Sequence, residues 1–210
     1  EPWRMAAAHL DAVYGDDLPA LEVVRRNEHR WRAVVALARS GTNAPLTSSA
    51  GRLFDAVSAI VLGRDAVSYE GQAAIELEQR ADRDERGGYP VRVRQEGRRL
   101  VLAGGDLVRC AVEDLLAGTG AERIAARFHN GLAAAVVQAV RRLCEQTGLG
   151  TAALSGGVFQ NVTLLDRVVA GLEAAGLRVL THSRVPPNDG GISLGQAAVA
   201  AARDRASRGG

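Results

Sequence analysis

The residue of this sequence best placed to do chemistry is Asp189, a carboxylate between a double proline and a double glycine. It lies in S-R-V-P-P-N-D-G-G-I-S-L-G-Q-A-A, residues 183–198. A carboxylate here can cap the helix predicted from about Gly190, because it can accept a hydrogen bond from a free backbone N–H. It can equally be a metal or phosphate ligand in a cleft, since the glycines leave it unshielded. Spacing alone leaves both interpretations open.

A second candidate is the pair Gly156-Gly157 in A-L-S-G-G-V-F-Q-N-V, where an apolar strand runs directly into a helix. Glycine lets the backbone approach a ligand closely, and free N–H groups at a helix N-terminus favour phosphate or carboxylate. Asn161, one turn in, could hydrogen-bond a ribose or a base. The simpler alternative is a tight strand-to-helix turn without a ligand, because Gly-Gly turns are frequent.

Three further polar residues give weaker signals. Asp55 follows Phe54 on a predicted helix, where an acid most often forms an exposed ion pair, and Arg52 beside it is one arginine among many. His129 sits in R-F-H-N-G-L-A, and a lone histidine of this kind is more often a satisfied polar group than a catalyst.

The composition excludes several mechanisms. All 26 basic residues are arginine, because the sequence contains no lysine, so a Schiff base and a lysine-containing phosphate loop are ruled out. The net charge of +2, without a basic stretch interleaved with aromatics, argues against a nucleic-acid partner. Cys110 and Cys144 are predicted to be buried thiols. With no apolar run of roughly 18 residues and no signal-peptide pattern, we expect a cytoplasmic chain with no membrane partner.

The hydrophobic periodicity predicts a helical subdomain over residues 1–85, an α/β lobe over 86–205 and a disordered tail at 206–210. Within the lobe, an alternating stretch predicts a β-hairpin with Val91 and Val93 on one strand and Leu100 and Leu102 on the other. After that the chain alternates strand, helix, strand and helix. Ligands in α/β folds lie outside the carboxyl ends of strands, which places the loop containing Asp189 beside the loop after Leu154.

Five stretches are more specific than composition explains. In chain order they are T-S-S-A-G-R-L-F-D-A-V-S-A-I, S-Y-E-G-Q-A-A-I-E-L-E, A-A-R-F-H-N-G-L-A, A-L-S-G-G-V-F-Q-N and R-V-L-T-H-S-R-V-P-P-N-D-G-G-I-S-L-G-Q-A. Together they resemble the C-terminal, Kae1/TsaD-like carbamoyltransferase region of the HypF family of hydrogenase maturation proteins, over essentially residues 1–205. The resemblance implies an α/β fold: the second lobe of an actin-like ATPase (ribonuclease H-like) fold, with a largely helical insertion before it.

The resemblance also implies a function. Such an enzyme binds ATP or carbamoyl adenylate and a divalent metal (Fe, Zn or Mg). It transfers the carbamoyl group to the C-terminal cysteine of a HypE-like acceptor protein, on the way to the cyanide ligands of nickel-iron hydrogenase. Carried over position by position, the nucleotide-binding residues are Asp55, Gly71, Gly156, Gly157 and Asn161, and the metal ligand is Asp189. The resemblance assigns no catalytic residue.

Two departures from the family pattern limit this assignment. The H-x-x-x-H pair that supplies the family's other metal ligands does not occur among the four histidines here. The family's upstream domains and its first lobe are also absent from this sequence. We therefore expect a fragment that is inactive alone and is completed by an upstream lobe of the same protein or by a separate chain. The alternatives are an O-carbamoyltransferase or a tRNA threonylcarbamoyl transferase of the same fold, or a non-catalytic nucleotide-binding or partner-docking module.

Overall fold

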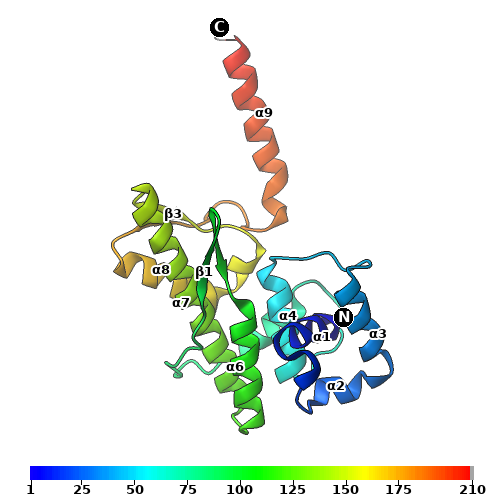
Figure 1. Cartoon of the computed structure of the whole chain (residues 1–210). Helices are drawn as coiled ribbons and strands as arrows, with labels where there is room; N and C mark the ends of the chain where they lie inside the picture. Colours follow the sequence, from blue (N-terminus) through cyan, green and yellow to red (C-terminus); the bar gives the residue numbers. More distant parts are fainter. Residues whose placement is uncertain (209–210) are drawn as a thin grey trace.

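The computed structural model describes residues 1–208 and begins with an all-helical part (Figure 1). Its helices are α1 (Pro2–Tyr14), the 3-10 turn η1 (Gly15–Asp17), α2 (Glu22–Arg26), α3 (Glu28–Ser40), α4 (Ala50–Val61) and α5 (Gln72–Arg80). α1 and α4 pack closely against each other, because each has one apolar face. The buried residues of these two helices include Trp3, Ala6, Ala7, Leu10, Leu53, Phe54, Val57 and Ile60. Helices are present where the periodicity predicts them, and the subdomain over residues 1–85 stays a prediction.

The middle of the chain forms a β-hairpin followed by two helices. Strands β1 (Val93–Glu96) and β2 (Arg99–Leu102) are antiparallel, with Val93 opposite Leu102. Helices α6 (Gly104–Leu116) and α7 (Ala121–Thr147) follow. The hairpin was predicted, but Val91 lies before β1, since the N–H of Arg92 is bound by the carboxylate of Asp106 at 2.9 Å.

The last part alternates strands and helices as predicted. Its elements are β3 (Thr151–Ala153), the 3-10 turn η2 (Gly157–Gln160), α8 (Val162–Ala174), β4 (Arg178–Leu180), the 3-10 turn η3 (Asp189–Gly191) and α9 (Ile192–Arg208). β3 and β4 are parallel, with Ala153 opposite Leu180, so their carboxyl ends lie at one edge. α8 packs along α7, whereas α9 projects away from the rest of the chain (Figure 1).

One hydrophobic core joins the helical part to the α/β part. It extends from Trp3 to Leu172 and includes buried side chains of α1, α4, α6, α7 and α8. The predicted boundary at residue 85 stays a prediction. Residues 206–208 of the predicted tail lie in the last turn of α9, and 209–210 lie outside the described residues.

Cys110 and Cys144 are free thiols that are only partly buried. Within residues 1–208, no helix has the length and apolar character of a membrane span.

The segment at Tyr89 crosses α7 at Gly131, and this crossing generates a prediction. The N–H of Tyr89 donates to the carbonyl of Arg127 at 3.1 Å, and a Cβ at Gly131 would collide with the backbone oxygen of Tyr89. We expect Gly131→Ala to lower the free energy of unfolding by at least about 1–3 kcal/mol, because backbone cannot move aside as a flexible side chain can.

Gly195→Ala in α9 is the matched control, since no atom lies within 4 Å of its added Cβ. Alanine favours an exposed helix over glycine by about 1 kcal/mol, so this variant should be neutral or stabilising. Urea unfolding followed by circular dichroism measures both. Equal stability of the two variants would contradict the close crossing at Gly131.

Candidate functional site

The loops that follow β3 and β4 lie side by side, as the parallel pairing predicts. Beyond the last paired residues, the N–H of Leu154 donates to the carbonyl of Leu180 at 2.9 Å. Further on, the N–H of Gly156 donates to the carbonyl of Pro187 at 2.8 Å. These bonds join the glycine loop (residues 154–160) to the proline loop (residues 181–191). Two stretches about 30 residues apart in the sequence thus form one edge of the molecule.

The two glycines of the glycine loop differ in their surroundings. Gly156 has a φ of 104°, which side chains with a Cβ rarely adopt, and no atom lies within 4 Å of the position of its missing Cβ. Gly157 faces the proline loop, with 3.8 Å between the position of its Cβ and the Cβ of Asn188. The open side of Gly156 leaves room for a ligand to approach the backbone, so its role as a nucleotide-binding residue stays a prediction with a consistent geometry.

The N-terminus of α8, in contrast, is already occupied by protein groups. The N–H of Thr163 donates to a carboxylate oxygen of Glu78 at 2.8 Å, and the N–H of Leu164 donates to Oδ1 of Asn161 at 2.8 Å. The expectation of free N–H groups at this helix start is therefore wrong for these two. The reason is that η2 separates the glycine pair from α8 by a turn, which brings Asn161 into the capping position.

Asn161 also holds His129, a histidine whose role the sequence left open. Nδ2 of Asn161 lies 3.0 Å from Nε2 of His129, and Nδ1 of His129 lies 2.7 Å from the carbonyl oxygen of Ala125. Because the carbonyl can only accept, the proton is on Nδ1 and Nε2 accepts from the asparagine. The histidine is fully buried and packs edge-on against Phe54 with ring centroids 5.2 Å apart. It is a satisfied polar group, as the simpler interpretation predicted, but it lies in the core and not at a helix edge.

Asp189 is not the helix cap. Oδ1 of Asn188 accepts the N–H of Gly190 at 3.1 Å, so the asparagine caps η3. The carboxylate of Asp189 is exposed, and it makes no hydrogen bond or ion pair with any other residue in the described range 1–208. Of the two interpretations left open by spacing, the structure removes the cap and leaves a free carboxylate beside the glycine loop.

The other two candidate residues lie on helices of the N-terminal part. Asp55 of α4 is 14% exposed and pairs with Arg52 at 2.9 Å. Burial raises the pKa of Asp55, and Arg52 opposes that rise. α4 packs against η2, which brings the Asp55 helix to the glycine loop. Gly71, at a φ of 81°, precedes α5. It is about 10 Å along that helix from Glu78, and its part in the site stays a prediction.

Two polar residues at the same edge were not singled out from the sequence. Nε2 of His182 lies 2.9 Å from Oγ of Ser155, at hydrogen-bonding distance, and both side chains are exposed. Ser155 follows Ala153 by two residues and His182 follows Leu180 by two, so the β3–β4 register sets them opposite each other. A predicted strand register would have been the signal that identifies the pair.

The residues present do not complete a metal site. Within residues 1–208, no group of three or more His, Cys, Asp or Glu side chains could hold a metal ion. Asp189 offers one carboxylate, whereas a divalent transition metal takes at least three protein ligands. The assignment of Asp189 as a metal ligand therefore stays a prediction that requires ligands from outside these residues.

The Asn161–His129 pair generates a prediction about pH. Burial lowers the pKa of His129, while its bond to Ala125 and the charge of Glu78 raise it and Arg167 lowers it. The unfolded chain therefore takes up this proton first, and stability is lost as the pH falls below about 6.5. We expect the urea midpoint to fall between about pH 7.5 and 5.5, and to fall less in Asn161→Asp. An aspartate still caps α8, and its carboxylate accepts a hydrogen bond from the Nε2–H of protonated His129, which stabilises the charged ring.

His29→Gln is the control, because this histidine is exposed and should leave the pH dependence unchanged. His9, whose pKa is also lowered by burial, contributes equally to all three proteins. If Asn161→Asp loses stability on acidification as steeply as the parent, His129 does not titrate with folding as inferred.

Comparison with known proteins places these features in a family. The family model described as "Carbamoyltransferase, Kae1-like Domain, second subdomain" matches residues 1–196. The carbamoyltransferase HypF of Rhodobacter capsulatus is 41% identical over 207 residues, which are 97% of this chain and 26% of that protein. A HypF homolog of Cupriavidus necator is 39% identical, over 99% of this chain and 54% of its own length.

Solved structures agree. Full-length HypF in a phosphate- and nucleotide-bound form matches with a TM-score of 0.84 and 33% identity, covering 94% of this chain and 26% of that one. HypF of T. kodakarensis matches with a TM-score of 0.74 and 25% identity, covering 93% of this chain and 27% of that one. The chain thus spans about a quarter of the first relatives it matches. The predicted fold class and the predicted resemblance are confirmed: the chain belongs to the HypF carbamoyltransferase family, as the second subdomain of its Kae1-like domain.

Proposed function

We propose that this chain supplies the second subdomain of a HypF-like carbamoyltransferase, which moves a carbamoyl group from carbamoyl adenylate to the C-terminal cysteine of a HypE-like acceptor in hydrogenase maturation. The observation that carries the proposal is the joined pair of loops at the carboxyl ends of β3 and β4, with a free carboxylate at Asp189 and open backbone at Gly156. The nucleotide in the HypF structure that this chain resembles supports an adenylate ligand.

The reaction requires the cysteine sulfur and the carbamoyl carbon to meet with the adenylate held still. The thiolate attacks the carbonyl carbon, a C–S bond forms, and the C–O bond to phosphate breaks as AMP leaves with the electron pair. Preorganised groups lower the barrier to such acyl transfer by holding developing charge without rearranging. In this chain the backbone around Gly156 and Gly157 would hold the adenylate, and Asn161 and Glu78 would keep that loop in place by fixing α8.

The proposal also requires components that this chain does not contain. An upstream lobe, of the same protein or a separate chain, would cover the adenylate from the other side. It would also supply the remaining ligands of a divalent metal at Asp189. The protein would work in the cytoplasm with a protein acceptor, which the net charge of +2 favours over tRNA.

A chimera tests this proposal. The matching quarter of Rhodobacter capsulatus HypF is replaced by this chain, and carbamoylation of a HypE acceptor is followed by mass spectrometry. We expect the chimera to transfer the carbamoyl group. Asp189→Asn should lower the transfer rate about a hundredfold, since a metal ion held by a carboxylate contributes several kcal/mol of transition-state stabilisation.

Asp17→Asn is the matched control, because this exposed acid of η1 lies in the helical part of the chain. Both variants should keep the unfolding midpoint of the parent, since Asp189 makes no contact that stabilises the fold. A chimera without activity would count against the carbamoyltransferase proposal. If the chimera is active and Asp189→Asn transfers carbamoyl as fast as Asp17→Asn, Asp189 is not part of the site, while the carbamoyltransferase proposal stands.

A further inference from the structure

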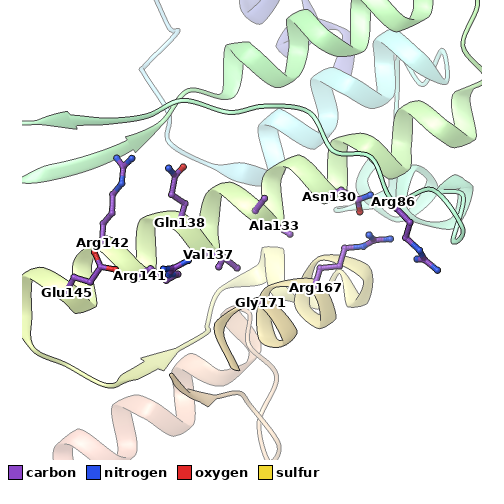
Figure 2. Close-up of a pocket in the computed structure, with 11 residues that line it drawn as sticks. Arg86, Asn130, Ala133, Val137, Gln138, Arg141, Arg142, Glu145, Arg167 and Gly171 are labelled. Atoms are coloured by element: carbon purple, nitrogen blue, oxygen red, sulfur yellow. The ribbon is translucent and has the colours of Figure 1, made fainter. Parts of the chain in front are cut away.

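A groove of about 650 Å³ runs between α7 and α8 and shares no residue with the candidate site (Figure 2). Its middle is apolar and narrow. A Cβ at Gly171 of α8 would lie 2.7 Å from a methyl carbon of Val137 of α7, so glycine permits the close approach of the two helices. Ala133 of α7 continues this floor (Figure 2). The groove is therefore built by helix packing and does not depend on a mobile loop.

The rim of the groove is strongly basic. Arg86, Arg141, Arg142 and Arg167 line it, and Glu145 is the one acidic residue that lines it within the described chain. Figure 2 shows Arg86 and Arg167 together at one end, and Arg141, Arg142 and Glu145 at the other. Burial lowers the pKa of Arg167, and the charge of Arg86 lowers it further, which agrees with two cations near each other.

These four arginines differ from the arginines that the fold pairs with acids. Arg39 lies 2.6 Å from Asp11, and Arg127 lies 2.9 Å from Asp114. Within residues 1–208, no groove arginine lies within 4.0 Å of a carboxylate. Arg142 donates to the carbonyl of Val93, and Arg86 to the carbonyl of Arg83. The fold therefore gathers four guanidinium groups around one groove, none of them in an ion pair within residues 1–208, and Glu145 is the acidic residue among them.

The length of the groove narrows the choice of ligand. Its lining residues on α7 run from Asn130 to Glu145, which is about 22 Å along a helix. A single small anion could reach the arginines at one end only. Nucleic acid is disfavoured, because no aromatic side chain lines the groove to stack a base. A polypeptide with carboxylates near both ends and small apolar residues between them would meet the arginines and the floor together.

We propose that the groove between α7 and α8 is a docking surface for an acidic polypeptide segment of a separate protein. Carboxylates of the segment would pair with Arg86 and Arg167 at one end and with Arg141 at the other, where guanidinium groups bind carboxylates in a bidentate manner. Its apolar residues would cover Ala133, Val137 and Gly171. The proposal does not depend on carbamoyl transfer.

Fluorescence anisotropy with a labelled peptide tests the docking surface. The probe is a peptide of about 15 residues of glutamate and alanine, long enough to span the groove as a helix. We expect the chain to bind it, and the double variant Arg141→Glu/Arg167→Glu to bind at least about tenfold more weakly, because charge-assisted hydrogen bonds are lost.

Arg98→Glu/Arg99→Glu in the hairpin is the matched control, with the same change in net charge at two exposed arginines outside the groove. It should bind within about twofold of the parent. Circular dichroism and the urea midpoint check that both double variants fold.

Three results would overturn the proposal. The first is no binding of the acidic peptide, and the second is an equal loss in both double variants, which would mean non-specific attraction. The third is tighter binding of tripolyphosphate or of a single-stranded oligonucleotide with the same dependence on Arg141 and Arg167. That result would assign the groove to a small anion or to nucleic acid instead.

Discussion

The buried hydrogen bond between Asn161 and His129 is the constraint on which the candidate site depends. It ties the start of α8 to the middle of α7, and the same asparagine caps α8 through its other amide atom. His129 can accept from the asparagine only while its proton is on Nδ1, which the carbonyl of Ala125 ensures. A chain of polar groups that are all satisfied in a dry core permits one arrangement. Gly156 and Gly157, a few residues before Asn161, are positioned by it.

The site itself follows from a short piece of parallel sheet. β3 and β4 contribute three residues each, yet their register brings Ser155 opposite His182 and joins Gly156 to Pro187. Two backbone hydrogen bonds continue past the strands and hold the two loops together. Asn188 takes the capping role, so the carboxylate of Asp189 stays exposed. Water solvates this charge, so leaving it without a protein partner carries no desolvation penalty. Exposure of this kind suits a ligand position.

Two charged features that form no ion pair within residues 1–208 bear on the roles proposed for the molecule. One is the carboxylate of Asp189 at the strand ends, and the other is the arginine rim of the groove between α7 and α8. Elsewhere, arginines such as Arg39 and Arg127 are paired with acids. Relatives about four times as long as the chain carry the same subdomain, so these groups fit a subdomain that works together with other polypeptide.

The sequence alone determined the order of helices and strands, because apolar periodicity and glycine positions are local signals. It also identified the glycine pair, and the P-P-N-D-G-G stretch carried the family assignment. Tertiary structure alone decided which groups were already used. Asn161 binds His129, 32 residues away, and Glu78 accepts the N–H of Thr163, 85 residues away, at the start of α8. The gathering of four arginines around one groove likewise joins separate segments of the chain. Each of these depends on distances between residues far apart in the chain, which a local pattern does not contain.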